Sequence, residues 1–279
     1  MIGNVVASYI EQEPPQVFAT GFADLDRVTN GGLRAGDLSV IGAASGVGKS
    51  AFAEQIAYNV SRDAPVLYLP LEMGERLTLL RMGARLDRVS YDTLQAQGLS
   101  WSSRDLLNSH DLCLLEPLMQ YIFGANEIMK AVCETGVKVV IVDHVRHIDG
   151  WLNANGSHVG ASAIVRRLRQ FASEMHVHVV LCCQMNRTAY GKRPQMNQLQ
   201  DTSALEQTAS LVMLLHRPFQ FRGALADTVT EMLIPKNRYG PCCMMHYRWV
   251  GLTMTLWPLT EEDVSHLTCC SRKGDYGGD

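Results

Sequence analysis

Residues 38–51 read LSVIGAASGVGKSA, and this stretch decides the fold. Its apolar start is typical of a buried strand, its middle is a glycine-bearing turn that ends in Lys49-Ser50, and a helical pattern follows. A strand, such a loop, Lys-Ser and a helix in this order are the context that a phosphate-binding loop requires. Gly46 and Gly48 let backbone N–H groups turn inward without a clashing side chain, and the positive end of the helix faces the same anion. The stretch therefore predicts a site for nucleotide phosphates at the end of a strand.

The predicted site uses eight consecutive residues. Lys49 is placed to reach the β- and γ-phosphates of ATP, and the Ser50 hydroxyl can ligate Mg²⁺. The usual pattern has glycine where this chain has Ala43. The residues expected to contact the nucleotide are Ala43, Ala44, Ser45, Gly46, Val47, Gly48, Lys49 and Ser50.

Two other apolar runs end in a carboxylate: 139–142 leads to Asp143, and 67–71 leads to Glu72. Phosphoryl transfer needs a carboxylate on the Mg²⁺ side and a group that orients or deprotonates water. Carboxyl ends of parallel strands meet at one edge of a sheet, so both side chains are expected beside the phosphate loop. We predict that Asp143 holds Mg²⁺ together with Ser50. Taken alone, Glu72 fits either a water-activating base or an ordinary residue at the start of a helix.

The remaining pattern predicts the α/β class, with a mostly parallel central sheet covered by helices. In one helical stretch the apolar face is formed by Ile164, Leu168, Phe171, Ala172 and Met175. Further strands are expected at 65–69, 137–142, 177–183 and 211–216.

A C-terminal antiparallel hairpin is also predicted. Two strand-like runs, 231–235 and 244–249, flank Gly240-Pro241, which is a turn signal.

Length and composition set the outer limits. The chain has 279 residues, a hydrophobic fraction of 47% and a formal net charge of −3, so it can bury a large core but has no general basic character. We expect a linker with a short helix at 1–19, one ATPase core at 20–258 and a flexible tail at 259–279. The chain shows no C-x-x-C spacing, no secretory signal and no membrane-length apolar run, which favours a reduced, soluble, cytoplasmic protein without structural zinc.

Seven segments carry a resemblance to a known family: 20–26 (TGFADLD), 31–33 (GGL), 36–38 (GDL), 71–73 (LEM), 184–187 (QMNR), 203–207 (SALEQ) and 236–241 (KNRYGP). In their order they are similar to the C-terminal RecA-like ATPase domain of DnaB-type replicative DNA helicases, which belong to a superfamily of hexameric helicases, and the resemblance covers about residues 20–255. In that family alanine often replaces the first glycine of the phosphate loop, so Ala43 agrees with it.

The resemblance implies an ATP-dependent DNA helicase that moves along single-stranded DNA in replication, 5′ to 3′, as a homo-oligomeric ring, usually a hexamer. ATP would lie at each subunit interface, where Lys236 and Arg238 reach the γ-phosphate of the neighbour's nucleotide. Glu72 would be the catalytic base, and Gln184 would sense the γ-phosphate and couple it to DNA. Arg81 falls where the family carries an arginine on the helix after that glutamate. The catalytic set is then Glu72, Lys49, Gln184, Lys236 and Arg238.

DNA is expected at two loops that line the central pore in related rings, here 150–160 and 186–199. The second loop carries Arg187, Lys192 and Arg193, which we predict to bind DNA phosphates without reading sequence. Three more arginines lie upstream in a helical stretch, Arg166, Arg167 and Arg169, and they fit a solvated helix face equally well.

The chain departs from the family in three ways. Only about 19 residues precede the core, so we expect no counterpart of the family's N-terminal collar domain, which meets primase. Thr208 and Ser210 stand where acidic residues are usual, and His144 stands where tyrosine is usual. Two alternatives stay open: a RecA-fold ATPase of the RadA or KaiC kind, and a non-motor nucleotide-binding module that modulates a host helicase. A helicase loader or a host replication protein is an expected partner; a membrane is not.

Overall fold

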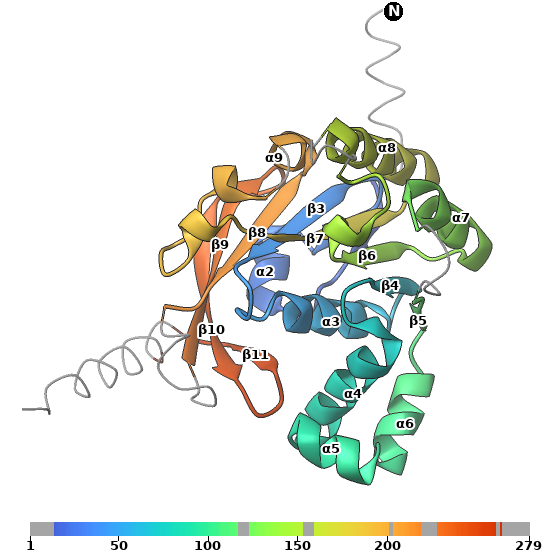
Figure 1. Ribbon diagram of the computed structural model, residues 1–279, viewed down its shortest axis with the longest axis vertical. Helices are drawn as coiled ribbons and strands as arrows, with labels where there is room; N and C mark the ends of the chain where they lie inside the picture. The colour runs from blue at the N-terminus through green and yellow to red at the C-terminus, as the bar shows by residue number, and fades with distance from the viewer. Residues whose placement is uncertain are drawn as a thin grey trace, which may run out of the picture.

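Each apolar run assigned to a strand forms one in the computed structural model (Figure 1). The structure describes residues 14–116, 123–152, 159–200, 203–218, 228–260 and 263. Its main sheet is built from β3 Leu38–Ala43, β4 Val66–Pro70, β5 Leu112–Leu114, β6 Val139–Asp143, β7 His178–Gln184, β8 Leu211–His216, β9 Thr228–Asn237, β10 Cys243–Val250 and β11 Thr255–Pro258.

The strand order confirms the predicted fold class. Across the sheet the order is β11-β10-β9-β8-β3-β7-β6-β4-β5, and every pair from β8 to β5 is parallel. The predicted hairpin is confirmed as β9 and β10, which pair antiparallel with Ile234 opposite Cys243. Two short edge strands, β5 and β11, were not predicted, and neither was a separate ribbon of β1 Val17–Phe18 and β2 Leu33–Arg34.

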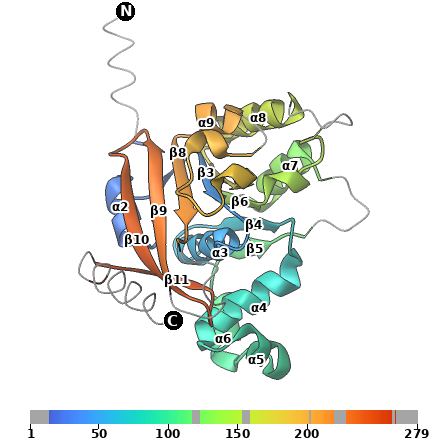
Figure 2. The same cartoon turned by 60° about the vertical axis from the view of Figure 1, so that its left-hand side comes forward.

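Helices cover both faces of the sheet (Figures 1 and 2). α7, α8 and α9 lie over one face, α2 and α3 lie over the other, and α4, α5 and α6 form a lobe beside β4 and β5. Their bounds are α2 Ala23–Val28, α3 Lys49–Val60, α4 Gly74–Asp87, α5 Tyr91–Gln97, α6 Trp101–Asn108, α7 Ala125–Thr135, α8 Val159–Met175 and α9 Ser203–Thr208.

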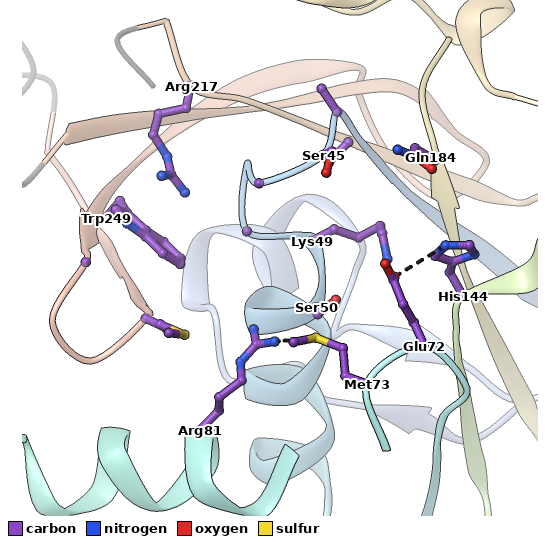
Figure 3. A pocket seen from close by; sticks show the side chains of 16 residues that line it. Ser45, Lys49, Ser50, Glu72, Met73, Arg81, His144, Gln184, Arg217 and Trp249 are labelled. Atoms are coloured by element: carbon purple, nitrogen blue, oxygen red, sulfur yellow. Dashed lines mark hydrogen bonds and ion pairs between the residues drawn. The ribbon is translucent and has the colours of Figure 1, made fainter. Parts of the chain in front are cut away.

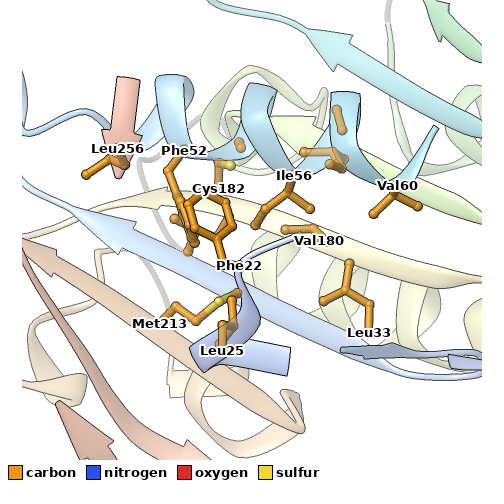
Figure 4. Packing of buried hydrophobic residues seen from close by; sticks show 14 of the residues in the cluster. Phe22, Leu25, Leu33, Phe52, Ile56, Val60, Val180, Cys182, Met213 and Leu256 are labelled. Atoms are coloured by element: carbon orange, nitrogen blue, oxygen red, sulfur yellow. The ribbon is translucent and has the colours of Figure 1, made fainter. Parts of the chain in front are cut away.

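Two apolar clusters hold these layers together. On the α3 face, Phe52 and Ile56 pack against Val180 of the sheet and Phe22 (Figure 4). Both α3 side chains are fully buried, and burying such a side chain contributes about 2 kcal/mol. This packing fixes the helix that follows the phosphate loop.

The α8 face was predicted correctly except at its end. Leu168 and Ala172 are fully buried, and Ile164 and Phe171 are partly buried against the same cluster. Met175 is instead 41% exposed, because α8 ends there and the chain turns into β7.

The N-terminal limit of the folded unit lies before Thr20. Val17 and Phe18 pair with β2, and Phe18 is buried, so these two residues of the expected linker are part of the folded structure. Residues 1–13 and most of the expected tail lie outside the described residues. No helix in the described part of the chain combines the length and apolar character of a bilayer span.

A buried histidine stands at the start of β7. The Nδ1 atom of His178 lies 2.7 Å from the carbonyl oxygen of Arg34, and its Nε2 atom lies 2.8 Å from the Ser39 hydroxyl. The carbonyl can only accept, so Nδ1 carries the proton and the Ser39 hydroxyl donates to Nε2. Burial lowers the pKa of His178 to about 4 from the ordinary 6.5.

This depressed pKa predicts acid sensitivity. The unfolded chain binds the proton more readily than the fold does, so His178 stabilises the fold above pH 6.5 and that contribution is lost as the pH falls toward 4. The difference in unfolding free energy between wild type and His178→Asn, measured by urea titration, should shrink by at most about 1.4 kcal/mol per pH unit in this window. A constant difference between pH 6.5 and 4 would contradict the assignment.

Candidate nucleotide site

The sheet register brings the predicted site residues to one edge. Ala43 pairs with Gln184 across β3 and β7, and Pro70 pairs with Asp143 across β4 and β6. All four residues end parallel strands, and Glu72 follows two positions after β4. The predicted phosphate, metal and water-activating groups therefore lie at the carboxyl edge of adjacent strands, which is the usual ligand position in such sheets.

The phosphate loop has the backbone that its glycines predict. Gly46 and Gly48 have φ angles of 77° and 111°, values that other residues rarely adopt. A Cβ atom at Gly48 would lie 2.9 Å from a ring carbon of Trp249. Lys49 then opens α3, so the helix N-terminus points at the loop, as anion binding requires.

Lys49 and Asp143 form a buried ion pair at the base of this loop. The other Asp143 oxygen accepts a hydrogen bond of 2.9 Å from the Tyr68 hydroxyl, and Ser50 also bonds this carboxyl group. Burial raises the pKa of Asp143, but Lys49 and these hydrogen bonds outweigh burial and leave it below its ordinary value. Burial lowers the pKa of Lys49, and Asp143 outweighs that effect. Both groups therefore stay charged.

The pair Ser50 and Asp143 fits Mg²⁺. A hydroxyl and a carboxylate lie within hydrogen-bonding reach of each other at the start of α3, and oxygen ligands of this type are those that Mg²⁺ prefers. The donor set supports the predicted metal role without assigning its geometry.

Glu72 reaches the same pocket from the turn after β4. Its side chain is 48% exposed, and its Oε2 atom lies 3.3 Å from Nε2 of His144 (Figure 3). Nδ1 of His144 accepts a hydrogen bond of 3.2 Å from the Arg146 N–H, so the proton of the neutral ring belongs on Nε2, facing Glu72. Burial and the nearby Lys49 lower the pKa of His144 to about 4. His144, which stands where the resembled family usually has tyrosine, thus lies next to Glu72, the predicted base.

Lys49, Ser50, Glu72 and His144 are among the residues that line a pocket of about 460 Å³. Figure 3 shows Arg217 and Trp249 on the side away from Glu72. The Arg217 guanidinium lies 4.1 Å from the centroid of the Trp249 ring and donates to the Val47 carbonyl. Burial lowers the pKa of Arg217 to about 10. Seven lining residues were not predicted as part of the site: Met73, Arg81, His144, Arg217, Trp249, Gly251 and Met254.

Arg81 belongs to a buried charge cluster between α3 and α4. Its Nε atom lies 3.4 Å from Oε1 of Glu54, and Arg85 approaches the other carboxyl oxygen at 3.3 Å. Burial raises the pKa of Glu54 to about 7 despite both arginines. Arg81 also donates to the Met73 sulfur at 2.9 Å, so the cluster contacts the residue next to Glu72.

Lys236 and Arg238 are not at this pocket. The N–H of Arg238 bonds the Ser210 carbonyl at 2.9 Å, and the Ser210 N–H bonds the carbonyl of Leu38, where β3 begins. The phosphate loop follows the other end of β3, which is roughly 16 Å away at ~3.3 Å per residue. The two cations therefore lie at the opposite edge of the sheet from the chain's own nucleotide site.

The predicted DNA residues have different surroundings. Lys192 is exposed, whereas Arg193 forms two hydrogen bonds of 2.7 and 2.8 Å with Glu231 on β9. The Arg187 side chain lies outside the described residues. In the first expected pore loop, Trp151 is fully buried and belongs to the core; residues 153–158 lie outside the described residues.

Arg169 in the upstream basic group has a structural role. Its guanidinium lies 2.8 Å from a carboxyl oxygen of the buried Asp37 and also donates to the Gly36 carbonyl. Arg166 and Arg167 are exposed, as a solvated helix face predicts.

Comparison with known proteins gives a consistent result. A family model described as "DnaB-like helicase C terminal domain" matches residues 18–256. The replicative DNA helicase DnaC of Bacillus subtilis (strain 168) is 28% identical over 237 residues, which are 80% of this chain and 52% of that protein. The chain thus spans about half the length of this relative.

Two solved structures share the fold. One, described as an ATPase domain, superposes with a TM-score of 0.78 at 22% identity, covering 93% of this chain and 97% of that one. A DnaB-like replicative helicase, described with its interactions with primase, gives a TM-score of 0.80 at 22% identity, covering 93% of this chain and 67% of that chain.

The pocket predicts a role for Trp249 in nucleotide affinity. Its ring borders Gly48 and is the largest aromatic ring among the residues that line the pocket. Trp249→Leu should weaken binding of a fluorescent ATP analogue about tenfold, since stacking of a base on an aromatic ring is worth ~1–3 kcal/mol. Trp257→Leu, a change at a 54% exposed position on β11, is the control. Equal affinities for both variants would exclude Trp249 from the site.

Proposed function

The chain belongs to the family of DnaB-like helicase C-terminal domains, and from this we propose that it is an ATP-driven motor that translocates on single-stranded DNA and unwinds DNA in replication. One observation carries the proposal beyond family membership. The nucleotide pocket and the pair Lys236 and Arg238 lie at opposite edges of one sheet, so the pair can complete a nucleotide site only in another copy of the chain.

Within one subunit, the phosphate loop would bind ATP. We propose that Lys49 exchanges Asp143 for the β- and γ-phosphates when the nucleotide enters. Ser50 and Asp143 would then hold Mg²⁺, which neutralises phosphate charge when bound. The position of the Lys49 ammonium beside Asp143, at the base of the phosphate loop, supports this exchange. A small rotation of the long lysine side chain would carry the ammonium from the carboxylate to the phosphates.

Glu72 would orient a water molecule and take its proton while the water oxygen attacks the γ-phosphorus and the bond to the ADP oxygen breaks. Its half-exposed carboxylate, beside the pocket and paired with a neutral His144, supports this role. Gln184, at the end of β7 and adjacent to Ala43, would contact the γ-phosphate. The chain continues from Gln184 into 186–199, which gives a direct route from phosphate to DNA loop.

The neighbouring subunit would supply Lys236 and Arg238. Lys236 donates to the carbonyl oxygens of Glu206 and Gln207, at 2.6 and 3.0 Å. Burial lowers the pKa of Lys236, and the positive charge of Arg238 lowers it further, because the two cations lie close together. Such a pair suits a highly charged anion, and in trans it would stabilise the charge that develops during phosphoryl transfer.

DNA would run through a ring, six subunits by family resemblance, with movement 5′ to 3′. Lys192 is exposed for a phosphate contact, and Arg187 and Arg193 would join it. For Arg193 to do so, a phosphate must replace Glu231 as its partner. A ring also brings the loops of all subunits together, which builds a basic pore from a chain with net charge −3. We further propose a helicase loader or another replication protein as partner.

The motor proposal predicts stimulation of ATP hydrolysis by single-stranded DNA. The wild-type rate should rise about tenfold or more with DNA, as expected if DNA binding at the loop after Gln184 is coupled to the γ-phosphate. Lys49→Ala, which removes the phosphate contact, is the blank in a phosphate-release assay. Turnover indifferent to DNA would count against the motor and in favour of a regulatory module.

The trans site predicts that Arg238→Ala separates binding from turnover. Hydrolysis should fall by about 10³-fold or more, the scale of an arginine supplied in trans, while affinity for a fluorescent ATP analogue stays within about twofold. Arg248→Ala, a change at an exposed position on β10, is the matched control. If Arg238→Ala loses binding and turnover together, the residue is structural.

A further inference from the structure

The turn that follows Lys236 and Arg238 is anchored to the start of β3. The next residue, Tyr239, turns its side chain inward, and its hydroxyl donates a hydrogen bond to the carboxylate of Asp37. The Arg34 guanidinium lies 4.3 Å from the centroid of the same ring. Tyr239 is therefore held at its hydroxyl and over its ring face.

The acceptor is itself fixed. Asp37 is 3% exposed, and its other carboxyl oxygen lies 2.8 Å from the Arg169 guanidinium on α8. Burial raises the pKa of Tyr239 to about 12, so the hydroxyl keeps its proton and donates. We call Arg34, Asp37, Arg169 and Tyr239 the anchor.

The backbone of the turn is seated on the end of α2 (Figure 2 shows α2 beside β9 and β10). The Asn237 amide donates to the Val28 carbonyl at 2.7 Å and accepts from the Tyr239 N–H at 3.1 Å. Asn30 donates to the Tyr239 carbonyl. A Cβ atom at Gly240 would clash with the Val28 oxygen, so glycine is what lets the turn sit this close.

These contacts fix the backbone on both sides of Arg238 in the sequence. Its neighbours Asn237 and Tyr239 are both tied to other elements, and its own N–H bonds Ser210 at 2.9 Å. Its side chain is exposed, with one guanidinium nitrogen 3.4 Å from the Gln207 carbonyl. The backbone of Arg238 is thus fixed while its guanidinium faces outward.

We propose that Tyr239 and Asp37 are positioning residues, which hold the turn so that Lys236 and Arg238 meet the nucleotide of the next subunit. This inference rests on the proposed function. Holding a catalytic cation on a fixed backbone reduces the ordering that each turnover requires. Neither residue reaches the carboxyl edge of its own sheet, so their effect is on the neighbour's site.

The first test is Tyr239→Phe, which keeps the ring under Arg34 and removes only the hydroxyl. DNA-stimulated turnover should fall about fivefold, the effect of losing one hydrogen bond from the active arrangement, while affinity for a fluorescent ATP analogue stays within about twofold. Tyr247→Phe is the matched control, because this buried tyrosine lies on the same hairpin and its hydroxyl donates a long hydrogen bond of 3.5 Å to the Met245 sulfur.

A mixing experiment separates positioning from a structural role. Tyr239→Phe subunits have an intact pocket, and Glu72→Gln subunits have an intact turn but an inactive pocket. In mixed assemblies the intact turns should act on the Tyr239→Phe pockets, so turnover should rise above that of Tyr239→Phe alone. No rise on mixing would overturn the inference, because the defect would then lie in the variant's own site.

The two proposals fail differently. If Arg238→Ala retains turnover, the proposed trans site fails. If Arg238→Ala loses turnover but folded Tyr239→Phe keeps it within about twofold of wild type, only the anchor inference fails. Should Tyr239→Phe not fold, Asp37→Asn decides: it removes the negative charge that strengthens the tyrosine hydrogen bond and pairs with Arg169, so both contacts weaken and the same loss and rescue on mixing are expected.

Discussion

The parallel register of β8, β3, β7, β6 and β4 is the constraint on which the rest depends. Because these strands run the same way, their carboxyl ends form one edge and their amino ends form the other. Lys49, Gln184, Asp143 and Glu72 come from four separate segments and meet only for this reason. The amino edge in the same way gathers Asp37, Ser210 and the end of β9, which are far apart in sequence.

The nucleotide site requires the fold to bury charged side chains beside α3. Lys49 with Asp143, and Glu54 with two arginines, lie under the phosphate loop in a region otherwise packed with apolar side chains. Buried ion pairs are weak sources of stability, because desolvation offsets their attraction. The apolar packing of Phe52 and Ile56 on the same helix supplies the stability that this polar region does not.

The sequence was enough to predict the phosphate loop, the parallel strands and both carboxylates, since each depends on residues within one strand and its following turn. Trp249 and Arg217 could not be predicted, because they reach the pocket only through the pairing of β8, β9 and β10. The pairing of Arg193 with Glu231 was missed for the same reason. Trp151 was assigned to a loop expected to line a pore and meet DNA, yet tertiary packing buries it, and no local pattern distinguishes a pore loop from a buried turn. What the structure confirms is the placement of these groups; the roles predicted for the phosphate loop, the two carboxylates, Gln184, Lys236, Arg238 and the DNA residues stay predictions.

The nucleotide pocket and the pair Lys236 and Arg238 lie at opposite edges of the sheet, so the domain has two different functional surfaces that face in opposite directions. In the proposed trans arrangement, contact between copies would join two different surfaces, so the interface would be heterologous and a two-fold dimer could not match both surfaces at once. An open row of copies would leave one pocket without cations at one end and one pair of cations without a pocket at the other. Only a closed assembly would complete every site, so the rate of hydrolysis per chain would report the fraction of chains in closed assemblies.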